Sequence, residues 1–131
     1  MSRRRTLDST VPSSYRELFV WQKAKTLAVQ IYRVTQPFPR DEIYGLTAQI
    51  RRTAVSVVSN IAEGQGRLTS KEFTHFLGQA RGSLLEVDAQ LAIALDLSYL
   101  ERNQYEHLSR QIYQVLGLLN RLMESLRRKA A

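Results

Sequence analysis

The chain has 131 residues, enough for one domain that buries roughly two thirds of its unfolded surface. It contains no cysteine, which excludes disulfides and thiolate metal sites. No apolar run of membrane-spanning length occurs, and no apolar segment follows the basic residues 3–5, so we expect a soluble cytoplasmic protein without a secretory signal.

The net charge of +7 is unevenly distributed along the chain. Residues 3–5 and 127–129 supply six of the 19 bases. Residues 16–81 hold ten bases and five acids, whereas residues 82–125 hold three bases and six acids. This asymmetry is compatible with a polyanionic partner on the basic half, with head-to-tail contact between subunits, or with ordinary solvated helix faces.

The first half of the chain predicts two helices. Residues 1–12 lack periodicity and are expected to form a flexible basic arm. Apolar residues recur every three or four positions over 14–36, which predicts a helix that the following prolines end. A second helix is predicted over 41–63, with Asp41 and Glu42 at the positive end of its dipole and Gly64 as a left-handed C-terminal cap.

The second half predicts two more helices, over 70–97 and 101–127, with 127–131 as a basic tail. Thr69 and Glu72 have the spacing of a capping box at the start of the third helix. Four long amphipathic segments with short connections predict an all-α, antiparallel up-and-down four-helix bundle over residues 13–126. The predicted core stripes are Val20, Ala24, Leu27, Ile31 and Val34; Ile43, Thr47, Ile50, Ala54, Val57 and Ile61; Phe73, Leu77, Ala80, Leu84, Val87, Leu91 and Ala94; and Leu108, Ile112, Val115, Leu119, Leu122 and Leu126.

Two helices carry more apolar surface than one bundle seam requires. The additional residues are Leu18, Phe19, Trp21, Ala28 and Tyr32 in the first helix and Tyr113, Leu116, Leu118 and Met123 in the fourth. They indicate either a homo-oligomer interface or a broader intramolecular core. Gly78 and Gly82, one turn apart in the third helix, favour a close helix–helix approach over a hinge.

Catalytic and metal-binding patterns are incomplete. A di-iron bundle needs two Glu-x-x-His motifs, and only Glu72 with His75 forms one. No Gly-x-Ser-x-Gly elbow or dinucleotide loop is present. We therefore expect no enzyme, no metal and no cofactor.

Phosphate binding is better supported by the residues. Fifteen of the 19 bases are arginine, whose planar fork engages phosphate in a bidentate way. The candidate nucleic-acid-binding residues are Lys23, Arg33, Arg51, Arg52, Arg67 and Lys71. The alternative is that the row Arg52, Ser56, Ser59 and Glu63 is an internal polar row, or an Arg–Glu network between subunits.

The chain resembles the small four-helix bundle proteins encoded in intervening sequences of large-subunit ribosomal RNA genes, which are related to the accessory variability determinant of diversity-generating retroelements. The resemblance runs from about residue 15 to 126. It is most specific at Asn60–Gly64 and the Arg51–Arg52 pair that precedes it, and the other matching stretches are 15–18, 20–24, 44–47, 49–50, 71–73, 76–77, 80–83 and 85–86.

The resemblance implies a ring-like homo-oligomer of five subunits and a non-enzymatic, basic scaffold for RNA or for a reverse transcriptase. The candidate family-motif or oligomer-interface residues are Trp21, Asn60, Glu63, Gly64, Gly78 and Gly82. We therefore predict a homo-oligomeric bundle that binds nucleic acid, RNA in particular. The alternatives are a protein–protein scaffold whose arginines hold its own ring together and, third, a metal-carboxylate enzyme.

Overall fold

The computed structural model describes residues 14–130, which form four α-helices, two short 3₁₀ helices and no strand. The all-α prediction is confirmed for this range. The expected arm over 1–12 lies outside the described residues. The elements are η1 (Tyr15–Glu17), α1 (Phe19–Val34), η2 (Arg40–Glu42), α2 (Leu46–Gln65), α3 (Ser70–Asp96) and α4 (Arg102–Ala130). None of these helices is both long enough and apolar enough to cross a membrane.

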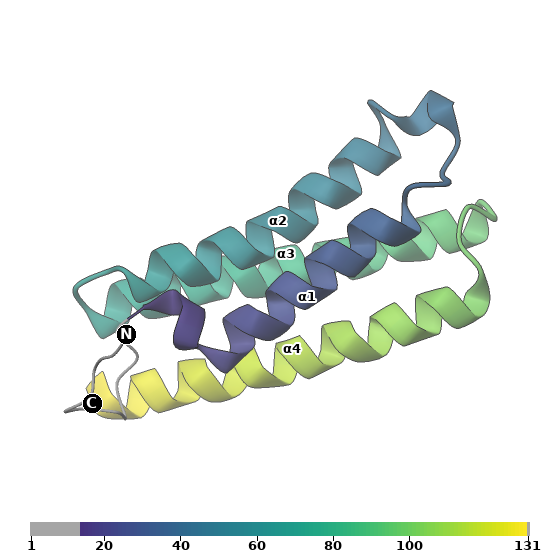
Figure 1. The fold of residues 1–131 in the computed structure, drawn as a ribbon. Helices are drawn as coiled ribbons and strands as arrows, with labels where there is room; N and C mark the ends of the chain where they lie inside the picture. The colour runs from purple at the N-terminus through teal and green to yellow at the C-terminus, as the bar shows by residue number, and fades with distance from the viewer. Residues whose placement is uncertain (1–13, 131) are drawn as a thin grey trace.

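The four long helices surround one core. α1 and α3 each contact α2 and α4 but not each other, so they occupy diagonal positions. Ser56 on α2 lies opposite Ser83 on α3, and Gly64 lies opposite Phe76, so that positions rise along one helix as they fall along the other. Figure 1 shows the α2–α3 turn and the end of α4 at one end of the molecule, with η2 and the α3–α4 turn at the other.

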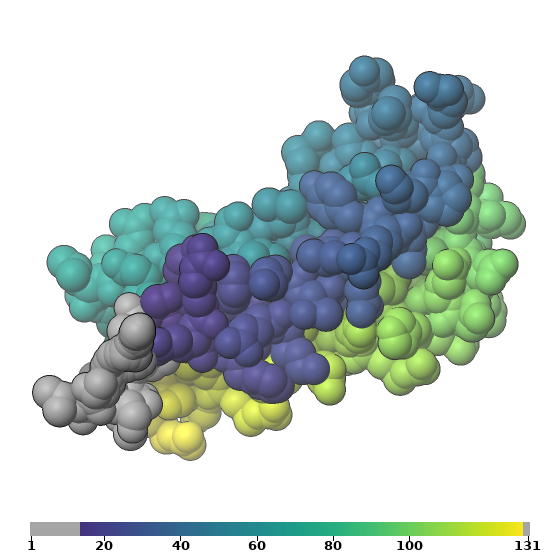
Figure 2. All heavy atoms as spheres, viewed as in Figure 1, coloured from purple at the N-terminus to yellow at the C-terminus, as the bar shows by residue number. Residues whose placement is uncertain are grey.

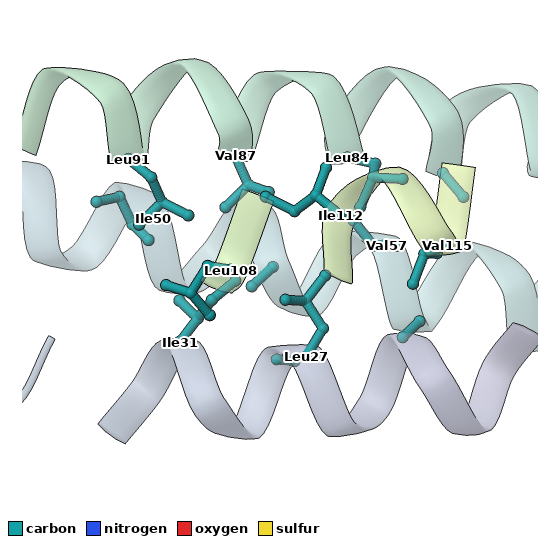
Figure 3. Packing of buried hydrophobic residues seen from close by; sticks show 14 of the residues in the cluster. Leu27, Ile31, Ile50, Val57, Leu84, Val87, Leu91, Leu108, Ile112 and Val115 are labelled. Carbon is teal, nitrogen blue, oxygen red and sulfur yellow. The ribbon is translucent and has the colours of Figure 1, made fainter. Parts of the chain in front are cut away.

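The core is built from the predicted apolar stripes. Ile31, Ile50, Leu84 and Ile112, one from each long helix, are fully buried, and their side chains point into the space between the helices (Figure 3). Ile43 departs from its predicted stripe and is 56% exposed, because it follows η2 and precedes the first turn of α2.

The first helix is shorter than predicted. Leu18 is extended and separates η1 from α1, and the Ser14 hydroxyl caps η1 by accepting a hydrogen bond from the Arg16 backbone N–H. α1 then ends at Val34, before Pro37. Apolar periodicity does not register a one-residue break, so residues 14–36 read as a single helix.

The second helix also begins later than predicted. Residues 40–42 form the 3₁₀ helix η2, and α2 starts only at Leu46. Glu42 Oε1 accepts a hydrogen bond from the Leu46 backbone N–H at 2.9 Å. Glu42 therefore satisfies the start of α2 from outside the helix.

Gly64 is not the left-handed cap that the sequence suggested. It lies inside α2, is buried, and has no positive φ. A Cβ atom at this position would lie 2.9 Å from Phe76 Cβ and 3.0 Å from Phe73 Cδ1. The glycine is therefore required for close packing of α2 against α3, next to the turn that joins them.

The start of α3 matches the prediction, whereas the end of α4 does not. The Thr69 hydroxyl accepts a hydrogen bond from the Glu72 backbone N–H at 3.1 Å. α4 continues to Ala130, so residues 127–130 are helical rather than a tail, and only residue 131 of that predicted tail lies outside the described residues.

The two glycines of α3 make no close helix contact within the chain. A Cβ atom at Gly82 would meet nothing within 4 Å, and one at Gly78 would touch only Met123 Cε at 4.0 Å. The expected close approach is therefore absent between the helices of one chain.

Candidate nucleic-acid interface

The two ends of the bundle carry opposite charge. The basic end comprises residues 63–81 at the α2–α3 turn and residues 120–129 on α4, with seven bases and three acids. The far end comprises residues 36–46 around η2 and residues 88–106 around the α3–α4 turn, with two bases and six acids. The sequence order hides this polarity, because each end combines segments that lie far apart along the chain.

A groove runs between α3 and α4 at the basic end, with a volume of about 750 Å³. Lys71 and Arg81 line it from α3, and Arg127 lines it from α4. The remaining lining residues are Ser70, Thr74, Asn120, Met123, Glu124 and Leu126. Three cations thus border one hollow that also offers hydroxyl and amide groups and an apolar part.

Two of these cations also have protein partners. Arg81 Nε donates a hydrogen bond to Asn120 Oδ1 at 3.0 Å, which joins α3 to α4 across the groove. Arg127 forms an exposed ion pair with Glu124. Lys71 is exposed and forms no ion pair with residues 14–130. Exposed ion pairs exchange readily with solvent and other anions, so Arg127 can contact a ligand without disrupting the fold. Lys71 can do the same because it is exposed and has no ion pair within the described chain to break.

Arg67 lies at the same end, beside the α2–α3 turn. Its Nη2 atom donates to Glu63 Oε2 at 2.7 Å, and its guanidinium lies 4.6 Å from the centre of the Phe76 ring. The predicted pair Arg67 and Lys71 is therefore brought together at the basic end. Glu63, one of the family-motif candidates, is an exposed partner of Arg67 within the chain.

Arg51 has a different environment from that expected of a phosphate ligand. Its Nε donates to Thr35 Oγ1 at 2.9 Å and its Nη2 donates to the Tyr32 carbonyl at 3.1 Å. The guanidinium also lies 4.7 Å from the centre of the Tyr32 ring. Arg51 thus binds the last turn of α1, where backbone carbonyls lack helical partners.

Of the other three predicted bases, Arg33 and Arg52 are exposed and Lys23 is half-buried. Arg33 lines a hollow with Tyr32 and Arg51 on the α1–α2 side. Arg52 is exposed and makes no hydrogen bond or ion pair with residues 14–130. Lys23 lies 5.5 Å above the Phe19 ring on α1 and lines neither the groove nor this hollow. The six predicted bases therefore do not form one surface.

Three of the six family-motif residues, Trp21, Asn60 and Gly64, make contacts within their own chain that hold its helices in place. Trp21 is only 8% exposed and packs edge-on against Tyr15 at 4.9 Å, so it belongs to the core of its own chain. Asn60 Nδ2 donates to the Ser56 carbonyl and hydroxyl, and Ser56 is hydrogen-bonded to Ser83 on α3. Ser56, a member of the predicted polar row along α2, therefore connects α2 to α3 within the chain.

Two tyrosine phenols have a raised pKa because of their surroundings. A hydrogen bond to Glu42 raises the pKa of the Tyr99 phenol, and burial, followed by the charge of Asp88, raises the pKa of the Tyr105 phenol. Neither phenol acts as a base at neutral pH. Within residues 14–130 no group of three or more His, Asp or Glu side chains is arranged to hold a metal ion.

Sequence reasoning missed Arg81 and Arg127 as site residues. Arg127 was placed in a tail, although the apolar stripe of the fourth helix reaches Leu126 and indicates that the helix continues. No local sequence pattern identifies Arg81 as a groove residue, because its side chain is positioned by a hydrogen bond to Asn120, 39 residues away.

Comparisons with known proteins agree with the fold. A crystal structure of a protein of unknown function from the S23 ribosomal protein family of Bacteroides thetaiotaomicron superposes with a TM-score of 0.72 at 23% identity, covering 79% of this chain and 97% of that one. No curated protein was found to be similar to this chain. The profile of the 23S rRNA-intervening sequence protein family matches residues 16–121. The chain therefore belongs to the 23S rRNA-intervening sequence protein family.

Proposed function

We propose that this protein is a non-enzymatic, antiparallel helical bundle that assembles with copies of itself and binds nucleic acid, RNA in particular, at its basic end. The observation that carries the proposal is the placement of Lys71, Arg81 and Arg127 around one groove. Two consecutive helices, α3 and α4, supply these cations from positions up to 56 residues apart, so the fold itself gathers them.

The chemistry of the groove suits a phosphate backbone. Arginine engages phosphate through two parallel N–H donors, and lysine acts as a point charge beside it. Arg67, Arg121, Arg128 and Lys129 extend the positive charge beyond the groove, with Glu63, Glu72 and Glu124 as the acids of the same end. A net positive end of this kind attracts any polyanion, and affinity that arises from phosphate contacts falls steeply with salt.

The test is RNA binding by fluorescence anisotropy at two salt concentrations with the Lys71→Glu/Arg127→Glu variant. Both side chains are exposed, so the substitutions leave the core intact. We expect the affinity to fall about tenfold or more and the dependence of log affinity on log salt to flatten by about one per lost phosphate contact.

The matched control is Arg40→Glu/Arg102→Glu, which changes the net charge by the same amount at the far end. We expect it to bind RNA nearly as well as the unaltered protein. Equal losses in the two variants would mean that only net charge matters, and the groove would not be the site. Absence of RNA binding in the unaltered protein would refute the nucleic-acid role.

The second candidate function is a protein–protein scaffold without a nucleic-acid role. It is favoured by the α1–α2 side, where Val29, Tyr32 and Val55 are exposed beside a mainly apolar hollow. A reverse transcriptase is the protein partner that the family resemblance suggests. Binding of such a partner by a protein that fails to bind RNA would favour this second function.

A further inference from the structure

The surface of this bundle has two strips of exposed apolar side chains, which we call strip A and strip B. Basic residues accompany the apolar side chains of strip A, and acidic residues accompany those of strip B. Strip A lies along the boundary between α1 and α2, two helices that lie side by side in Figure 2. Its apolar members are Val29, Tyr32 and Val55, and its charged members are Lys25 and Arg33. No acidic residue lines the hollow that these residues share.

Strip B lies on the outer side of α3, the helix diagonal to α1. Its exposed members recur at helical spacing, so they share one face of α3, and they are Gly82, Leu85, Glu86, Ala89, Ile93, Asp96 and Leu97. No base occurs between Arg81 and Arg102 in the sequence. The small residues Gly82 and Ala89 leave room for another helix, since a Cβ atom at Gly82 would meet nothing within 4 Å.

We infer that strip A of one copy docks on strip B of a second copy, in a head-to-tail contact that buries the exposed apolar side chains. This inference rests on the proposal that the protein assembles with copies of itself, and it names the two faces that meet. Lys25 and Arg33 then face Glu86 and Asp96 of the second copy. Complementary charge of this kind fixes the register and disfavours contact of a strip with its own kind.

In a two-fold symmetric dimer, strip A of each copy would have to meet strip B of the other copy at the same time. The positions of the two strips on the bundle exclude this arrangement. Strip A belongs to α1 and α2, strip B faces outward from α3, and α1 does not touch α3. Each copy therefore offers its strips to two different neighbours. Contacts of this heterologous type build a ring where the rotation closes and a filament where it does not.

The test measures the mass of the full chain in solution by light scattering after size-exclusion chromatography, for the unaltered protein and two variants. Val29→Glu places an acid in strip A, and Ile93→Lys places a base in strip B, so each repels the opposing strip. Val29 is 42% exposed and Ile93 is 52% exposed, so both variants should retain the helical circular dichroism of the folded chain. The matched control is Tyr44→Glu in the connection before α2.

We expect the unaltered protein and the control to be larger than a dimer and each variant to fall to the 15.1 kDa monomer. An equimolar mixture of the variants should form a 1:1 pair of about twice that mass, because each variant keeps the strip that the other lacks. A mixture that stays monomeric, or variants that keep the full mass, would overturn the assignment of the strips while leaving assembly itself intact. If the unaltered protein is a monomer, both the docking of strip A on strip B and the assembly part of the proposed function are wrong. RNA binding at the basic end is tested by the separate anisotropy experiment.

Discussion

The two ends of the bundle are held together in different ways. At the far end, the Tyr99 hydroxyl donates to Glu42 Oε2 at 3.0 Å, and the Tyr99 ring lies 5.5 Å from that of Phe38. At the basic end, the α2–α3 turn is packed through Gly64, while α4 is separated from the first turns of α3 by a groove. Side chains join the connecting segments at the far end, whereas the basic end is open on one side.

The difference also separates two kinds of arginine. Arg51 lies toward the far end and uses its donors to hold the last turn of α1. Arg127 lies at the basic end, where its partner is an exposed carboxylate on the same helix. A base is available to a ligand only when its donors are not already needed by the fold, and this requirement cannot be judged from residue type.

The largest effect on stability is expected from Gly64→Ala at the basic end. The new Cβ would lie 2.9 Å from Phe76 Cβ, and overpacking of this kind costs about 1–3 kcal/mol. The gain in helix propensity is only about 1 kcal/mol, so the net change is a loss. Urea unfolding followed by circular dichroism at one fixed protein concentration measures it.

Gly78→Ala is the matched control for Gly64→Ala, because the same change is made in a helix where the added Cβ meets only Met123 Cε, at 4.0 Å. We expect Gly78→Ala to gain up to about 1 kcal/mol from helix propensity. Equal effects at the two positions would contradict the view that Gly64 is a packing residue.

The next effect is expected from Arg51→Ala near the far end. Loss of the hydrogen bonds to Thr35 and Tyr32 should lower the free energy of unfolding by about 1–2 kcal/mol. RNA affinity should change little, because Arg51 does not line the groove. Arg52→Ala, at the neighbouring exposed position, should stay within about 0.5 kcal/mol of the unaltered protein. A large loss of RNA affinity in Arg51→Ala alone would move the candidate site to the α1–α2 side.

A smaller effect is expected from Tyr99→Phe at the far end, which removes the hydrogen bond to Glu42 and keeps the ring contact with Phe38. The pKa of the Tyr99 phenol is raised in the folded protein, so its contribution to stability is complete below the ordinary value of 10.0. The contribution is lost as the pH rises through the raised value. Unfolding midpoints of the two proteins should therefore differ at pH 8 and converge once the pH has risen through the raised pKa of the Tyr99 phenol. A difference that persists in strong alkali would mean that the hydroxyl does not act through this bond.

The smallest effect is expected from Glu63→Gln, which removes the ion pair with Arg67 beside the α2–α3 turn. Exposed pairs with this spacing on a helix contribute about 0.3–0.5 kcal/mol. The difference in unfolding free energy should shrink further in 1 M salt, because salt screens exposed charges. A loss as large as that of Gly64→Ala would show that the turn depends on charge rather than on packing.

The element boundaries and one glycine show where sequence reasoning reaches its limit. Periodicity does not reveal the 3₁₀ helices that precede α1 and α2, or the start of α2, because it averages over several residues. The role of Gly64 was misjudged because a local rule for helix ends was applied to a position that packs against Phe73 and Phe76 of the next helix. Both errors concern contacts or breaks that no local pattern records.

The sequence by itself determined the number and type of the long helices, the apolar stripes that form the core, and the cap at Thr69. These features depend on spacing within a few residues, because a helix repeats every 3.6 positions. The tertiary structure alone decided which bases share a surface. Lys71 and Arg127 stand 56 positions apart in the chain and line one groove because α3 and α4 pack side by side, while Arg51 is drawn to the end of α1 by Thr35 and Tyr32.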